Sequence, residues 1–177
     1  MNRNAVLEYS VTGTTGTEPV LLADVKQALN MVFDTAGSYE FTDDDTYITS
    51  LISAARTIIE NYIGQSIVEK TIVAAVQNDL GGVRLPMHPV KSITAIVDEN
   101  DTAVSYTTKG VGQKTIESPL LSYLKCTYVA GMTEIPSDLK QAIICQAVYL
   151  YQNRGESNLS ADAKKYAAPY YNKLWLQ

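Results

Sequence analysis

The stretch TDDDTYITSLISAARTIIENYIG, residues 42–64, predicts the longest helix of the chain, at 43–63. Apolar side chains recur in it at steps of three and four residues, which gives the helix one wide apolar face. Its first residues form an acidic run that suits the positive end of a helix dipole. This run comprises Asp43, Asp44 and Asp45. Gly64 ends the helix, as glycine commonly does. We expect a polar side in solvent, made up of Arg56, Glu60 and Asn61.

A long amphipathic helix is stabilised mainly by burying its apolar face, so another part of the chain must cover it. The best candidate is a helix at 136–153, because Pro136 is favourable in a first helical turn. Its apolar stripe comprises Leu139, Ala142, Ile143, Ala147 and Leu150. Shorter helices are predicted at 22–31 and 160–173, and Pro169 should break or kink the second of them.

The middle of the chain has a period near two, which is typical of strands. We expect strands at 66–76, 83–85, 90–97, 103–107 and 121–129. The turn signal at 78–82 predicts that the first two form a hairpin. A short strand at 5–11 and a flexible polar linker at 12–18 come before the helices. The predicted fold class is α+β: a helical bundle frame with an inserted, mostly antiparallel β-subdomain at about 66–130.

Composition places the chain among globular proteins, with 177 residues, 46% hydrophobic and 19% charged. The net charge is −5 and unevenly spread, since residues 1–64 hold three basic and nine acidic side chains and residues 136–177 hold five and three. This argues against nucleic-acid binding, which needs clustered Lys and Arg. It suits a protein that meets different partners at its two ends, although an ordinary solvated surface explains it equally well. No signal segment or membrane span is evident, so we expect a cytoplasmic protein.

The sequence holds little catalytic chemistry. His88 is its one histidine, set between prolines, so a His-based metal cluster is excluded and a catalytic triad would have to use this residue. We expect His88 to be a surface loop residue. Cys126 and Cys145 are expected to be two buried thiols without a disulfide or metal. The run of three aspartates lacks the alternating ligands of a calcium loop. We therefore expect no enzyme, no cofactor and no metal site.

The last 29 residues are rich in aromatic side chains, which are enriched where proteins dock. They include the only tryptophan and five of the twelve tyrosines, namely Tyr149, Tyr151, Tyr166, Tyr170 and Tyr171. For Tyr149 and Tyr166 we expect packing on the protein's own core. For Leu174, Trp175 and Leu176 we favour docking on a partner, because an exposed apolar chain end is costly unless something covers it.

Several motifs occur in a fixed order. They are Pro19–Leu22 with Lys26; Asp43–Asp45 with Ala54, Ala55, Arg56, Glu60, Asn61 and Tyr62; Leu85–Val90; Tyr128–Gly131 with Pro136–Ile143; and Tyr151 with Arg154. Together, over about residues 19–172, they resemble the head–tail connector family of tailed bacteriophages, the adaptor or head-completion proteins. The chain has Asn30 where many members carry an arginine, so any contact of that arginine is not implied.

The resemblance implies a structural virion protein, not an enzyme, located in the neck and present in the host cytoplasm during assembly. Such proteins form a dodecameric ring under the portal, extend the DNA channel without sequence-specific binding, and present a platform to stopper or tail-completion proteins. It implies a single connector domain at 19–169 after an N-terminal strand and linker at 1–18, with a docking tail at 170–177. The expected portal-docking residues are Tyr170, Tyr171, Leu174, Trp175 and Leu176. The candidate channel lining comprises Asp43, Asp44 and Asp45.

Three other classes of function stay open on the sequence. The first is another neck protein, such as a stopper or tail terminator. The second is a helical interaction module that has nothing to do with a virus. The third is a hydrolase that uses His88.

Overall fold

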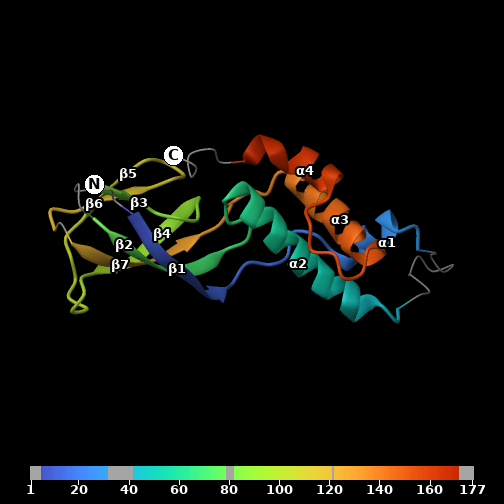
Figure 1. The fold of residues 1–177 in the computed structure, drawn as a ribbon, viewed down its shortest axis with the longest axis horizontal. Helices are drawn as coiled ribbons and strands as arrows, with labels where there is room; N and C mark the ends of the chain where they lie inside the picture. Colours follow the sequence, from blue (N-terminus) through green and yellow to red (C-terminus); the bar gives the residue numbers. More distant parts are fainter. Residues whose placement is uncertain (1–4, 32–41, 79–81, 121, 172–177) are drawn as a thin grey trace. The chain divides into compact units, whose positions relative to one another are not determined.

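The computed structural model describes residues 5–31, 42–78, 82–120 and 122–171. The chain forms two compact units, and each is made from two separate stretches of sequence. A β unit takes Met1–Thr17 and Gly64–Thr133, and a helical unit takes Glu18–Ile63 and Glu134–Gln177. Figure 1 shows the strands gathered in one unit and the helices in the other, which confirms the α+β class.

The helical unit contains α1 (Leu22–Ala28), α2 (Asp45–Ile63), α3 (Ser137–Gln152), α4 (Ala161–Ala167) and the 3-10 helix η1 (Ala168–Tyr170). Helix α3 packs against each of the three other α-helices. The predicted stripes of α2 and α3 meet in the core of this unit. Their fully buried members include Ile48, Ile52, Ala55, Ile59, Leu139, Ala142, Ile143 and Ala147. The predicted partnership of the two long helices is therefore confirmed.

The helix ends differ from the predicted ones for local reasons. Helix α2 begins at Asp45 and not at residue 43, so its first acids lie in the turn that precedes it. Helix α1 ends at Ala28 because Asn30 takes a left-handed conformation with φ of 56°. Helix α4 ends at Ala167, and the chain tightens into η1 where Pro169 cannot continue the α-helical hydrogen bonds.

A buried glutamine fixes the turn between α3 and α4. Gln146 is fully buried, and its side-chain amide donates to the carbonyl oxygen of Asn158 at 2.9 Å. Its amide oxygen accepts from the backbone N–H of Ser160 at 2.8 Å. The Ser160 hydroxyl then caps α4 by accepting from the N–H of Ala163 at 3.2 Å. Each polar atom of the buried amide thus has a partner, as burial requires.

The β unit contains two antiparallel sheets. The larger has the order β1 (Ala5–Thr14), β2 (Lys70–Gln77), β7 (Tyr123–Ala130), β4 (Val90–Val97). The smaller has the order β3 (Gly82–Arg84), β6 (Thr115–Glu117), β5 (Thr107–Lys109). Alternate residues of β7 face the core, which lies on one side of the larger sheet. They are Leu124, Cys126, Tyr128 and Ala130.

The strands differ from the prediction in several places. The strand expected at 103–107 is wrong, because β5 covers Thr107–Lys109. The expected hairpin is wrong, because β2 pairs with β1 and β7 while β3 pairs with β6. Strand β6 was missed, since its three residues are too few to show a period. Strand β1 reaches Thr14, so it includes residues of the expected linker, and the next two N–H groups, of Thr15 and Gly16, donate to the carbonyl of Glu69.

Candidate functional site

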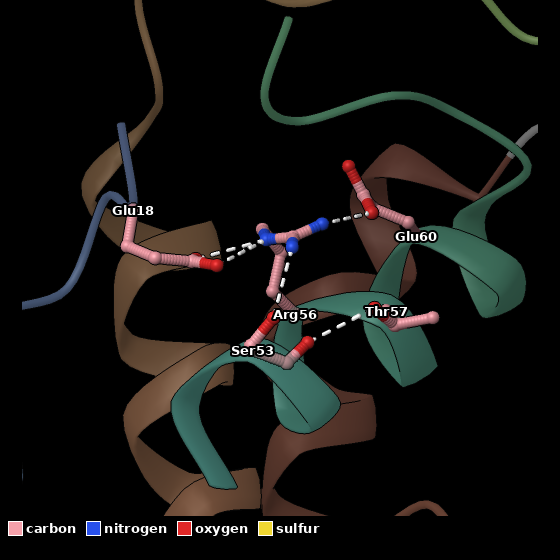
Figure 2. Close-up of polar contacts among 5 residues, drawn as sticks. All are labelled: Glu18, Ser53, Arg56, Thr57 and Glu60. Carbon is pink, nitrogen blue, oxygen red and sulfur yellow. Dashed lines mark hydrogen bonds and ion pairs between the residues drawn. The ribbon is translucent and has the colours of Figure 1, made fainter. Parts of the chain in front are cut away.

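The most buried charge cluster of the helical unit is centred on Arg56 of α2, which is 5% exposed (Figure 2). Its Nε donates to the two carboxylate oxygens of Glu18 at 3.1 and 2.8 Å. Its Nη1 donates to Glu60 at 2.7 Å, and its Nη2 donates to the hydroxyl of Ser53 at 3.2 Å. Burial alone would lower the pKa of Arg56, but the bonds and charges of Glu18 and Glu60 outweigh it and raise that pKa.

This cluster corrects the expected polar side of the long helix. Arg56 and Glu60 are buried, and only Asn61 of the three predicted residues is exposed. The reason is that Glu18, from the segment before α1, lies over Arg56 and supplies a second carboxylate. A charge can be buried when its hydrogen bonds are satisfied in this way. Helical periodicity carries no information about a residue 38 positions away.

Two of the three acids at the start of α2 have partners within the helical unit. Asp45 forms an ion pair with Lys26, which is 2% exposed at the end of α1, so this pair ties α1 to α2. Asp44 accepts from the hydroxyl of Tyr151 at 2.5 Å and lies 3.7 Å from the guanidinium of Arg154. The hydrogen bond to Asp44 raises the pKa of Tyr151. Asp43 is exposed.

Arg154 completes a contact between the start of α2 and the end of α3. Its guanidinium carbon lies 5.2 Å from the ring centroid of Tyr47 and 5.7 Å from that of Tyr151. A cation over an aromatic face at this distance is attracted by the ring quadrupole. The Tyr151 and Arg154 motif, noted from the sequence, therefore fastens two helix ends together.

The predicted docking residues are only partly within the described structure. Tyr170 and Tyr171 are half-buried, and the ring of Tyr171 packs on Tyr62 of α2 with centroids 5.2 Å apart. Leu174, Trp175 and Leu176 lie outside the described residues. The expected core packing of Tyr166 is wrong, because this side chain is 41% exposed on the outer side of α4. Tyr149 is half-buried on α3.

His88 is not a surface residue, which corrects that prediction. It is 9% exposed in the loop between β3 and β4, and its carbonyl oxygen accepts from the N–H of Ser66 at 2.8 Å. Burial lowers the pKa of His88, so the neutral imidazole is favoured. The loop Leu85–Val90 enters the unit's interior because Leu85, Met87 and Val90 are all core residues.

No group of three or more His, Cys, Asp or Glu side chains able to hold a metal occurs in the part of the chain that the structure describes. Cys126 is buried and Cys145 half-buried, and both are free thiols. Burial raises the pKa of Cys126 to about 12. Within the described ranges, no helix has both the length and the apolar character to cross a membrane.

The sequence analysis missed a second apolar stripe on α3. Its residues follow the same steps of three and four as the buried stripe, but on the other side of the helix. Its apolar members are Ile144, Cys145, Val148 and Tyr149, and the polar residues Gln141 and Gln152 continue the same row. With Ala28 of α1 and Asp162 of α4 they line a groove of about 270 Å³. The sequence could have revealed this second stripe, because α3 has apolar residues on two sides and such a helix needs two partners.

Ion pairs and ring contacts thus join the helices of one unit, and apolar surface remains on both units. The chain belongs to the head completion protein family, since the family model "HCP: Head completion protein" matches residues 30–161. No curated protein matches it.

Solved structures share the fold across nearly the whole chain. A chain from the neck of an empty gene transfer agent (GTA) particle, computed with C6 symmetry, is 17% identical with a TM-score of 0.72, covering 94% of this chain and 96% of that one. A chain from the virion of a native GTA particle is 19% identical with a TM-score of 0.71 and the same coverage. A chain from the neck of a native GTA particle, computed with C12 symmetry, is 18% identical with a TM-score of 0.61, covering 92% and 95%.

Proposed function

We propose that this protein is a non-enzymatic structural component of a virion neck, an adaptor that forms a ring under the portal. The observation that carries the proposal is the near-complete coverage of both chains in the match to neck chains, together with the family match over residues 30–161. The ring extends the DNA channel and offers a platform to stopper and tail-completion proteins. The subunits assemble in the host cytoplasm and remain in the virion.

A ring of identical subunits needs two different, complementary faces on each subunit, because the contact is head-to-tail. The two units of this chain differ in secondary structure, since one holds the strands and the other the helices, which supports such an arrangement. Similar chains come from particle necks computed with C6 and with C12 symmetry, in line with a ring of twelve. We propose that residues 19–169 act as the connector body of each subunit.

We propose that residues 170–177 dock on the portal, through Tyr170, Tyr171, Leu174, Trp175 and Leu176. Tyr171, at the start of this segment, packs on Tyr62 of α2. Two truncations separate anchoring from docking. A chain that ends at Tyr171 keeps the aromatic contact between Tyr171 and Tyr62, whereas a chain that ends at Ala168 loses it.

The candidate channel lining is also open to a clean test. Asp44 and Asp45 have partners inside the helical unit, so replacing them disturbs α2 as well as the surface charge. Asp43 is exposed, and Asp43→Asn changes charge alone. We propose that this charge keeps passing DNA from adhering. DNA packaging and ejection that are unchanged by Asp43→Asn would contradict a lining role for this residue.

The first experiment is co-sedimentation with the cognate portal ring, with stoichiometry, for the full chain and for chains ending at Tyr171 and Ala168. The adaptor role predicts about one copy per portal subunit. Loss of binding in both truncations would place docking in the last six residues, and loss only after Ala168 would place it at the tyrosines. Failure of the full chain to bind the portal, with binding to tail proteins instead, would favour a stopper or tail terminator.

A further inference from the structure

Helix α3 presents an apolar stripe that its own unit leaves half-covered. Ile144, Cys145, Val148 and Tyr149 are each intermediate in exposure, and they form the floor of the 270 Å³ groove between α1 and the start of α4. The helix is already held on its other side by α2. Among the described residues this stripe thus keeps exposed apolar area that another chain can cover.

The β unit carries a feature of the opposite shape. Val111 lies at the tip of the loop between β5 and β6 and is 96% exposed, more than any other large apolar side chain of the described residues. The loop is tight, since Gly110 has φ of +98° and a Cβ there would stand 2.3 Å from the carbonyl oxygen of Gln113. Only glycine tolerates this conformation easily. The loop thus holds Val111 outward in a set position, which lowers the entropy lost on binding.

We propose that the Val111 loop of one copy seats in the α3 groove of the next copy. The proposal rests on the proposed ring and names its subunit contact. The two features differ and lie on different units, so the contact is head-to-tail, the kind that closes a ring. Charge agrees with this pairing: Lys109 and Lys114 flank the loop without an acid between them, and Asp162 lines the groove. Each lysine-to-aspartate attraction is weak, because Lys109 also pairs with Glu117 and Asp162 with Lys165.

A native thiol makes the contact directly testable. Cys145 lies in the groove and is half-exposed, whereas Cys126 is fully buried in β7 and is shielded from reagents. In the full-length variant Val111→Cys, mild oxidation or a short bismaleimide should join residue 111 of one copy to Cys145 of another. The reaction is run on the portal-bound protein and on concentrated free protein, and the linked peptides are identified by mass spectrometry. Because Val111 is almost wholly exposed, this substitution leaves the core intact.

Two variants serve as controls. Val111→Cys combined with Cys145→Ser should give no such link. Asn100→Cys places a thiol on another exposed turn of the same unit and should link to Cys145 far less. As an independent measurement, Val111→Asp should weaken self-association about tenfold or more, because a valine that the proposed contact covers is replaced by a charge.

The outcomes separate this proposal from the adaptor role. The link between residue 111 and Cys145 of different copies, in either sample, supports the groove contact. Absence of the link from both samples, while the protein still binds the portal, overturns the groove contact and leaves the adaptor role standing. Portal-bound rings that form equally well with Val111→Asp do the same. A link from Cys145 to a portal thiol in place of residue 111 also overturns it. Absence of portal binding with the link present contradicts the adaptor role alone.

Discussion

The two units bury their polar groups differently. In the helical unit, Arg56, Lys26 and Gln146 are almost fully buried, and each is held by charged or amide partners. In the β unit, the central cluster is apolar, and its largest polar member, Tyr128, has a hydroxyl that lacks a hydrogen-bond partner among the described residues. The helical unit thus buries Arg56 with carboxylate partners, whereas in the β unit the buried amide of Asn78 donates to the backbone carbonyls of Ser118 and Leu120.

The largest expected effect comes from breaking the buried cluster of the helical unit. Arg56→Ala leaves Glu60 buried without this cation, and removing one partner of a buried pair costs about 3–5 kcal/mol. Urea unfolding with hydrogen exchange should show the loss first in α2 and α3. The matched control is Lys164→Ala at an exposed position of α4, which should change the free energy of unfolding by about 0.5 kcal/mol or less.

A double variant sharpens that test. Replacing a buried ion pair by apolar groups of similar size is often neutral or stabilising. Arg56→Met with Glu60→Leu should therefore recover most of the stability lost in Arg56→Ala, because Glu18 is 35% exposed and can return to water. A double variant as unstable as the single one would show that the cluster is not held by paired charge.

A smaller effect is expected where the β unit depends on close backbone approach. A Cβ at Gly131 would stand 2.7 Å from the Cα of Glu69 and 2.9 Å from the carbonyl oxygen of Val68. Backbone atoms cannot move aside cheaply, so Gly131→Ala should destabilise the β unit by about 1–3 kcal/mol. Gly155→Ala is not a matched control because its φ is +92°, whereas Gly13→Ala meets nothing within 4 Å and should cost less. Equal unfolding midpoints for Gly131→Ala and Gly13→Ala would contradict the expected steric clash at Gly131.

Tyr128→Phe should stabilise the β unit. Burial raises the pKa of Tyr128, and its hydroxyl is an unpaired buried group within the described structure. Removing an unsatisfied buried hydroxyl recovers its desolvation cost, so Tyr128→Phe should stabilise the β unit by roughly 1 kcal/mol. The paired hydroxyl of Tyr151 offers the contrast, because Tyr151→Phe should destabilise the helical unit by about 1–2 kcal/mol. Loss of stability in Tyr128→Phe would mean that this hydroxyl has a partner.

The smallest effect is a pH dependence of the β unit. The pKa of His88 is lowered in the folded state by burial, so the unfolded chain binds its proton more readily. The stabilising contribution of neutral His88 is thus complete above the unfolded pKa of about 6.5 and is lost as the pH falls from there through the folded pKa. Free energies of unfolding measured from pH 8 to pH 5 should fall less steeply in His88→Gln. Parallel curves would exclude His88 as the cause.

The prediction from sequence worked best where structure is local. The periods of α2 and α3 placed two helices and their shared core correctly, since an amphipathic stripe is a property of neighbouring residues. The range of β4 at 90–97 was also correct. The helix ends were less accurate, because Asn30 and Pro169 act through backbone conformation and not through the apolar period.

The candidate site was less accessible from sequence. The motif residues Lys26, Arg56 and Arg154 were noted for their order along the chain, but their partners Asp45, Glu18 and Asp44 could not be assigned. Polar residues on a helix normally face solvent, and only the covering segment shows that Arg56 does not. His88 was misplaced for the same reason, since its loop looks like a surface turn until its apolar neighbours are seen in the core.

By itself, the sequence determined the α+β class, the two long helices and the run of strands between them, because these depend on the spacing of apolar residues a few positions apart. The tertiary structure alone decided that β1 pairs with β2 some sixty residues away, that Glu18 covers Arg56, and that Val111 stands out while His88 is buried. These arrangements depend on contacts between segments that are distant in sequence. The free energy of such contacts cannot be inferred from the spacing of neighbouring residues.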